Sequence, residues 1–261
     1  MNIIVCMKQV PDPESPASAF EIDSEAKQVK LKGVPPVLNP FDENALEAAL
    51  RIKGAHQSKI TVISMGKTLA KPVLRKALAA GADEMFLLED ASFGDLDSYA
   101  TASLLAAAIK KIGAYDIIFT GRQASDTDAG VVGSGIAELL GIPVITIARK
   151  VEMNDGKLRV ERALADGHEV VETSLPALVT VSNELGELRS IAMKELIAAQ
   201  KMPMKTITAQ ELGIEPQSSK RATLLKLFIP KREVHCDIIG GGTPEEAGAN
   251  LAIKLRESQL I

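Results

Sequence analysis

The sequence predicts an α/β fold built on a doubly wound, mostly parallel sheet, with a small antiparallel excursion and an extended C-terminal arm. Over the first part of the chain, short β-rich runs alternate with runs in which Leu, Ile or Ala recur at helical spacing. A glycine follows each helical run, where a helix commonly ends on a left-handed residue. This alternation implies crossover connections and a parallel sheet that helices cover on both faces.

The expected elements of this first part follow one another in strict alternation. The strands are predicted at Ile3–Cys6, Lys59–Ser64, Glu84–Leu88, Asp116–Thr120 and Pro143–Ile147. The helices are predicted at Ala45–Lys53, Leu69–Ala80, Tyr99–Ile112 and Val131–Leu140, and they end at Gly54, Gly81, Gly113 and Gly141.

The pattern changes after residue 147. Hairpin signals at Asn154-Asp155-Gly156 and Asp166-Gly167 predict the antiparallel excursion, and Ala177–Val181 is expected to return to the sheet. Ala192–Gln200 is predicted to be a helix, whereas Met202–Thr223 is polar and shows little periodicity.

The C-terminal stretch has no room for a core of its own, which indicates an arm that lies over a partner. Leu224–Pro230 is expected to be extended, and Gly240–Gly242 to form a flexible joint. Thr243-Pro244-Glu245-Glu246 is a capping box with Pro at the first helical position, and it predicts a final helix to about Glu257. The basic pairs Lys220-Arg221 and Lys231-Arg232 are expected to be solvated surface.

Composition and charge exclude several classes of protein. The 261 residues are 46% hydrophobic and 25% charged, with a formal net charge of -4, so neither nucleic acid nor an anionic membrane is expected as the main partner. No apolar run approaches the roughly 20 residues of a membrane span. The strand-like run from Asn2 to Val5 leaves no room for a signal peptide, and we expect a cytoplasmic protein.

Cysteine, histidine and aromatic residues are too few or too scattered for several chemistries. Cys6 and Cys236 are far apart and have no C-x-x-C companion, so neither a disulfide nor a zinc site is expected. His235 is a poor base for Cys236, because adjacent side chains rarely face each other. Trp is absent and Tyr and Phe are scarce, so an aromatic redox group is expected to lie largely against another chain.

Three loops at the expected carboxyl ends of strands carry candidate ligand-binding residues. The first, Cys6-Met7-Lys8-Gln9-Val10-Pro11-Asp12, follows the first strand. The second, Asn39-Pro40-Phe41-Asp42, fits a helix start with Asn as N-cap, Pro at N1 and Asp at N3, and a capped helix start is its plainer interpretation. The third runs from Gly121 to Gly133, between a strand and a helix.

The third loop is the most indicative of a phosphate ligand. Its small residues let a ligand approach the backbone, and free N–H groups at the helix start suit a phosphate. The opposing interpretation is that Asp126 or Asp128 only caps the helix, and their charge would oppose a phosphate. Its residues are Gly121, Arg122, Gln123, Ala124, Ser125, Asp126, Thr127, Asp128, Ala129, Gly130, Val131, Val132 and Gly133.

The sequence contains no recognisable catalytic constellation. It has no P-loop, no G-x-G-x-x-G fingerprint, no nucleophile elbow and no H-E-x-x-H. This indicates a carrier or a binding subunit.

An ordered series of motifs resembles the beta subunits of electron-transfer flavoproteins and covers about residues 1–205. The motifs are CMKQVPD, LNPFDENALEAALRIK, ITVISMGKTLAKPVLRKALAAGADEMFLLED, GRQASDTDAGVVG and KLRVERALADGHEVVETSLPALVTVSNE. The resemblance implies a Rossmann-like, adenine-nucleotide-binding domain that pairs with an alpha subunit. It implies that the main redox FAD is held mostly by the alpha subunit, and that this subunit buries a second nucleotide, AMP or a second FAD.

The resemblance also assigns roles to single residues. It places the ribose and phosphate of the nucleotide in the Gly121–Val132 loop. Met193 falls on a recognition loop, where an apolar side chain fills a pocket on a partner dehydrogenase, expected to be of the acyl-CoA type; the plainer alternative is an ordinary helical core residue. The residues implied around the nucleotide are Cys6, Asn39, Pro40, Phe41, Asp42 and Met65.

These roles divide the chain into three expected parts. Residues 1–190 would form the nucleotide-binding domain and residues 191–204 the partner-recognition loop and helix. Residues 205–261 would form an arm and helix packed on the alpha subunit.

The third loop departs from the family pattern. Members often carry Gln two residues after the second Asp, or an Asn-Gln-Thr run where this chain has Gly130-Val131-Val132. Side-chain donors to the phosphate are therefore missing, and backbone N–H groups would have to serve. The Gly121-Arg122-Gln123-Ala124 opening resembles the bifurcating, anaerobic members, which favours FAD over AMP and adds flavin-based electron bifurcation to the expected functions.

Two other functions compete with an electron carrier. One is a free-standing adenine-nucleotide-binding module of the universal-stress type, but Gly121 and Gly133-Ser134 stand too far apart for its glycine spacing. The other is a metabolic transferase that uses the same cleft, for which turnover by the isolated chain would be the signature.

Overall fold

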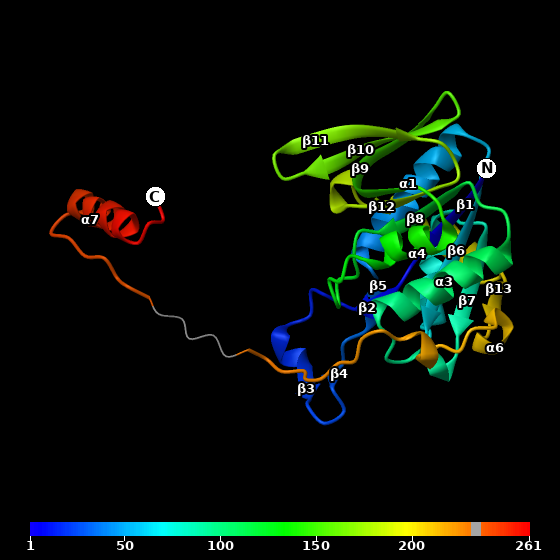
Figure 1. Cartoon of the computed structure of the whole chain (residues 1–261), viewed down its shortest axis with the longest axis horizontal. Helices are drawn as coiled ribbons and strands as arrows, with labels where there is room; N and C mark the ends of the chain where they lie inside the picture. The colour runs from blue at the N-terminus through cyan, green and yellow to red at the C-terminus, as the bar shows by residue number, and fades with distance from the viewer. Residues whose placement is uncertain (231–235) are drawn as a thin grey trace.

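The computed structural model describes residues 1–230 and 236–261 and confirms the predicted α/β class (Figure 1). The described chain is organised around a nine-stranded sheet with the order β11-β10-β9-β12-β8-β1-β6-β7-β13. Its strands are β1 (Asn2–Cys6), β6 (Lys59–Gly66), β7 (Glu84–Glu89), β8 (Ile117–Gly121), β9 (Val144–Asn154), β10 (Lys157–Leu164), β11 (Gly167–Thr173), β12 (Ala177–Val181) and β13 (Met204–Ile207).

The central strands are parallel and almost wholly apolar. β1 pairs in parallel with β6 on one side and β8 on the other, and every residue of β12 is buried. Such continuous apolar runs are typical of strands covered on both faces. β10 is antiparallel to β9 and β11, so these three strands are the predicted excursion.

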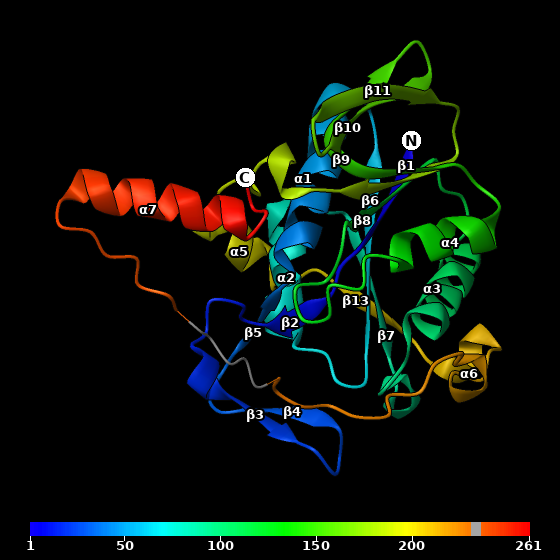
Figure 2. The same cartoon turned by 60° about the vertical axis from the view of Figure 1, so that its left-hand side comes forward.

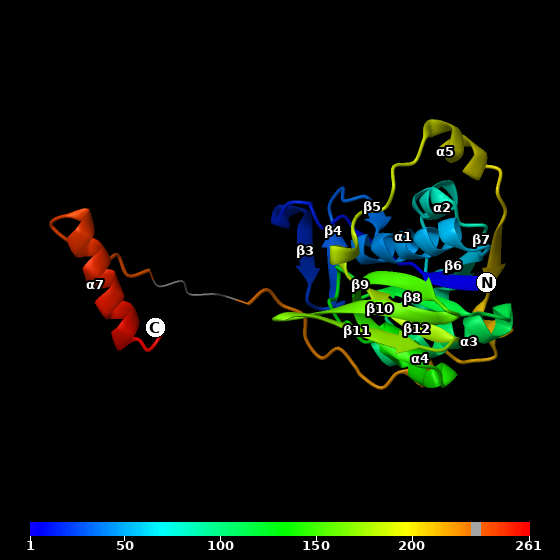
Figure 3. The ribbon, with the colours of Figure 1, turned by 90° about the horizontal axis from the view of Figure 1, so that it is seen from above.

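Helices cover the sheet on both faces, as predicted from the alternation. Figure 3 shows α1 and α2 on one side of the strands and α3 and α4 on the other. Each face has its own apolar cluster: one joins the sheet to α1 and α2, and the second joins it to α3 and α4. The helices are α1 (Pro40–Ala55), α2 (Lys71–Ala80), α3 (Ser98–Ile112), α4 (Val132–Leu140), α5 (Met193–Ala199), α6 (Ala209–Leu212) and α7 (Pro244–Glu257).

Two small antiparallel pairs lie between β1 and α1. β2 (Gln9–Pro11) pairs with β5 (Pro36–Leu38), and β3 (Phe20–Asp23) pairs with β4 (Gln28–Leu31). The first pair brings the segment after β1 against the start of α1. The β3–β4 hairpin stands out from the body in Figures 1 and 2.

The segment Met202–Thr223, whose sequence shows little periodicity, contains regular structure over part of its length. β13 pairs in parallel with β7 at the edge of the sheet, and α6 follows it. The strand is short and its burial is not alternating, so period-two patterning gives no signal there. The sheet thus reaches into the segment assigned to the arm.

The end of the chain leaves the body. Figures 1 and 3 show α7 apart from the sheet, and none of its residues is buried. The predicted cap of α7 is confirmed, since the Thr243 hydroxyl accepts a hydrogen bond from the backbone N–H of Glu246. Lys231, Arg232 and His235 lie outside the described residues. No helix in the described part of the chain is long and apolar enough to cross a membrane.

Candidate functional site

The three predicted loops meet at the carboxyl ends of β1 and β8, which are neighbours in the sheet. The Asp42 carboxylate joins them, because its Oδ2 accepts the backbone N–H of Lys8 at 2.7 Å and its Oδ1 accepts that of Gly121 at 3.0 Å. The backbone N–H of Asn39 also donates to the Lys8 carbonyl at 2.9 Å. One buried acid at the start of α1 therefore fixes the relative positions of all three loops.

The Asn39 side chain does not cap α1, contrary to the plainer interpretation of that segment. It is buried at 1% exposure, its Nδ2 donates to the Gln123 carbonyl at 2.8 Å, and its Oδ1 accepts the Ser125 N–H at 3.1 Å. The sequence spacing fits a cap, but a fold that places the third loop beside this side chain offers it stronger partners. Asn39 thus ties the second loop to the third.

Neither acid of the third loop caps α4, and that interpretation was wrong. Asp126 forms an ion pair with Lys8 at 2.7 Å, and Asp128 accepts a hydrogen bond from the Gln123 side chain at 2.8 Å. α4 has Val131 at its N-cap and no side-chain cap, so no side chain caps the backbone N–H groups of its first turn. The negative charge that would oppose a phosphate is thus partly compensated by Lys8. The backbone N–H groups that would hold a phosphate have no side-chain cap.

Burial controls the two titratable groups that the three loops enclose. Burial raises the pKa of Asp42 to about 7, against the lowering effect of the hydrogen bonds from Lys8 and Gly121. Burial, followed by the charge of Asp42, raises the pKa of the Cys6 thiol to about 12. Cys6 is therefore protonated and buried at the end of β1, and it is not a nucleophile.

Two glycines make the close approach of these segments possible. A Cβ at Gly121 would lie 2.5 Å from Asp42 Oδ1 and 2.8 Å from the backbone carbon of Phe41. A Cβ at Gly133, in the first turn of α4, would lie 2.6 Å from the Thr120 hydroxyl. The start of α4 therefore packs directly on β8 and β12, and its free N–H groups lie beside the loop.

A nucleotide fits the residues at this site. The Ser125 hydroxyl is buried and has no hydrogen-bond partner in the structure, which is the condition expected of a group that awaits a ligand. Open N–H groups, small residues and paired acids surround the same loop. The chemistry of this donor set suits a ribose and a phosphate.

The other predicted residues lie around the same three loops. Cys6 ends β1, and Met65 is the residue before the end of the neighbouring β6. The Arg122 guanidinium lies 5.4 Å from the centre of the Phe41 ring. Pro40 occupies the first turn of α1. The Ala124 carbonyl accepts the N–H groups of Thr127 and Asp128 and so forms the turn that leads to Ala129, Gly130, Val131 and Val132.

The contact of Lys8 with the third loop was not predicted. Lys8 belongs to the first loop, but its ion pair with Asp126 joins residues 118 positions apart. Neither spacing nor motif signals such a contact, because it arises only when the carboxyl ends of β1 and β8 are brought together.

Met193 lies away from the three loops, at the first residue of α5. Its side chain is 70% exposed, so the helical-core alternative is wrong; Ile197, four residues on, is 59% exposed. The segment before α5 is fixed to α1, since the largely buried Glu47 carboxylate accepts the Arg189 Nε at 2.9 Å and its backbone N–H at 3.2 Å. The Arg75 guanidinium donates to the carbonyls of Ala199 and Met202 at the other end.

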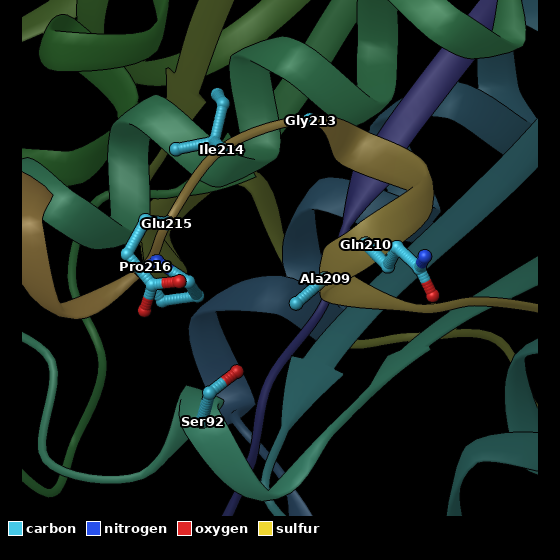
Figure 4. Close-up of a pocket in the computed structure, with 7 residues that line it drawn as sticks. All are labelled: Ser92, Ala209, Gln210, Gly213, Ile214, Glu215 and Pro216. Atoms are coloured by element: carbon cyan, nitrogen blue, oxygen red, sulfur yellow. The ribbon is translucent and has the colours of Figure 1, made fainter.

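A cavity of about 350 Å³ lies elsewhere, between α6 and the segment after β7 (Figure 4). It contains none of the predicted site residues. Its lining residues are Ser92, Ala209, Gln210, Gly213, Ile214, Glu215 and Pro216. We assign it no part in nucleotide binding.

Comparison with known proteins shows which proteins this chain is similar to. Residues 28–212 match the family model described as the electron transfer flavoprotein domain. The chain is 44% identical to the electron transfer flavoprotein subunit beta of Clostridium acetobutylicum and 42% identical to that of Thermoanaerobacterium thermosaccharolyticum, each over the full length of both chains. It is 38% identical, again over both full lengths, to the caffeyl-CoA reductase-Etf complex subunit CarD of Acetobacterium woodii.

Proposed function

Because this chain belongs to the electron transfer flavoprotein family and matches its beta subunits over its full length, we propose that it relays electrons as one half of a heterodimer with an alpha subunit. The observation that carries the proposal is the joining of the three loops by Asp42 and Asn39 at the carboxyl edge of the sheet. Membership of this family favours the electron carrier over a free-standing nucleotide module.

The nucleotide of this subunit is proposed to lie at the three loops, as FAD or AMP. The first-turn N–H groups of α4 would hold a phosphate, and the unpartnered Ser125 hydroxyl would donate to a ribose or phosphate oxygen. A bound FAD accepts and passes on electrons, whereas AMP carries none. The small side chains of the Gly130-Val131-Val132 run and the Gly121-Arg122-Gln123-Ala124 opening favour FAD and electron bifurcation. The main redox FAD is proposed to be held mostly by the alpha subunit.

Met193 is proposed to contact a dehydrogenase, of the acyl-CoA type, that exchanges electrons with the heterodimer. Its support is the exposed apolar pair on α5, held in place from α1 and α2. Met193→Glu is expected to weaken electron exchange with that dehydrogenase without changing nucleotide content. The adjacent exposed change Lys194→Gln serves as its control.

Coexpression with the alpha subunit of the same organism tests the proposal. We expect a yellow heterodimer that contains FAD, and a colourless or unstable chain when the beta subunit is produced alone. A stable lone chain that binds no alpha subunit and no flavin in any preparation would refute it. A cytoplasmic location is part of the same proposal and is tested by fractionation.

A further inference from the structure

After α6, the C-terminal arm is held by hydrogen bonds and an ion pair to the segment Ser92–Tyr99, before and into α3. Figures 1 and 2 show the orange segment after α6 passing beside this loop. The Gln217 amide donates to the carbonyls of Ser92 and Gly94 at 3.1 and 3.2 Å. Lys220 forms an ion pair with Asp95 at 2.9 Å.

Asp97 makes the strongest contacts between this loop and the arm. Its Oδ2 accepts the backbone N–H of Arg221 at 2.5 Å and that of Ala222 at 2.6 Å. Its Oδ1 accepts the N–H of Ala100 at 2.8 Å and so caps α3. The Arg221 guanidinium also lies 5.1 Å from the centre of the Tyr99 ring. The Lys220-Arg221 pair is therefore a fastening point and not simple solvated surface, which corrects the sequence-based expectation.

Immediately after Ala222 the arm becomes rich in exposed apolar side chains. Leu225 is 82% exposed and Ile229 is 72% exposed, and the segment Leu224–Pro230 has no strand or helix partner among the described residues. Residues up to Ala222 are thus held by specific hydrogen bonds. The apolar side chains that follow are presented outward from a fixed position.

We propose that Asp97 is a positioning residue for subunit assembly: with one carboxylate oxygen it caps α3, and with the other it holds the arm root in the direction from which the arm reaches the alpha subunit. This inference rests on the proposed function, since it requires an alpha subunit as the arm's partner. A segment that is held in place before binding loses less conformational entropy when it docks. The hydrogen bonds from the arm root to Asp97 therefore raise affinity without adding a contact to the partner. The hydrogen bonds are charge-assisted, which makes them stronger than neutral ones.

Two variants separate this role from the capping of α3. Asp97→Asn retains one oxygen, which suffices for an N-cap, but turns an amide toward the two N–H groups of the arm root. Ala222→Pro removes one of these N–H groups and leaves Asp97 and α3 untouched. Ala222→Ser keeps the N–H and is the matched control.

The test measures the affinity of the full-length chain for its alpha subunit, the unfolding midpoint of the lone chain, and hydrogen exchange at the amides of Arg221 and Ala222. We expect both Asp97→Asn and Ala222→Pro to weaken affinity about tenfold, with Ala222→Ser within about twofold of wild type. Asp97→Asn should speed exchange at the two amides, while Ala222→Pro leaves the unfolding midpoint unchanged.

Wild-type affinity in Ala222→Pro, or unchanged amide exchange in Asp97→Asn, would overturn the role of Asp97 while leaving the heterodimer intact. Failure of the wild-type chain to bind any alpha subunit would instead refute the proposed function, and this inference with it.

Discussion

Two regions of this chain treat their apolar side chains in opposite ways. The sheet body buries them in two clusters, one against α1 and α2 and the other against α3 and α4. Beyond Ala222 the arm buries none of its described residues: Leu225, Phe228 and Ile229 are exposed before α7, and Leu251 and Ile253 are exposed on it. Both regions contain apolar residues of the same types, so composition does not distinguish them. They differ because the apolar side chains of the body pack between the sheet and its helices, whereas those of the arm have no second layer to pack against.

This contrast explains why the body has a fold of its own and the arm does not. Burial of a Leu or Ile side chain contributes about 1.5–3 kcal/mol, and the arm obtains none of it within the chain. An exposed series of this kind marks a surface for another protein. This contrast supports the proposal that the body binds the nucleotide and that the arm binds the partner subunit.

The largest effect is expected from a charge placed in the arm. Leu225→Glu should weaken heterodimer affinity by about a hundredfold, because burial of the leucine is lost and an unpaired charge would have to be buried. The free energy of unfolding of the body should stay within about 0.5 kcal/mol of wild type. Titration of the alpha subunit against each variant measures the affinity.

Thr223→Glu adds the same charge at an exposed polar position of the same segment and is the control. If both variants bind as tightly as wild type, the arm is not the partner-binding region.

A smaller effect is expected in the body, where a substitution should change stability and nucleotide content. Gly121→Ala should lower the free energy of unfolding by about 1–3 kcal/mol and reduce nucleotide content, because the new Cβ meets Asp42 and the backbone of Phe41. Gly54→Ala, near the end of α1 with open space around it, should be neutral or stabilising by up to about 1 kcal/mol. Urea unfolding and nucleotide extraction measure both; equal unfolding curves for the two variants would contradict the proposed packing of the loops.

A third effect is a pH dependence located at Asp42. Its pKa of about 7 in the folded chain lies above the value near 3.9 expected when unfolded, so between these pH values the folded chain holds a proton that the unfolded chain has released. The contribution of Asp42 to the free energy of unfolding therefore falls as pH rises through this window, by up to about 1.4 kcal/mol per pH unit. Asp42→Asn should remove that part of the slope between pH 5 and pH 7. Parallel slopes for the variant and wild type would show that Asp42 stays ionised in the fold.

The sequence predicted the body well because its signals are local. Periodicity and the glycines Gly81, Gly113 and Gly141 place α2 to α4 within a few residues of their bounds. The bounds of α1 were predicted less well: it starts at Pro40, before its first periodic residue, and Gly54 does not end it, because the helix continues to Ala55. Turn residues located the β9–β10–β11 excursion. β13 was missed because a short edge strand next to a solvated surface shows no period.

The site was predicted as three loops, but not the contacts between them. Asn39, Asp126 and Asp128 each fit a cap by spacing, and each has its partner on another loop or on a neighbouring side chain. Long-range pairs such as Lys8 with Asp126 depend on which strands are neighbours. That order is a property of the assembled sheet and not of any motif.

The most direct test of the account is to purify the heterodimer, release its nucleotides by denaturation and quantify them by mass spectrometry. We expect one FAD and one further adenine nucleotide per heterodimer; the second is FAD if the bifurcating assignment is right and AMP if the subunit has a structural nucleotide. The Gly121→Ala variant is expected to lose only the second nucleotide. A heterodimer that holds a single FAD and no other nucleotide would contradict the claim that the three loops joined by Asp42 form a nucleotide site.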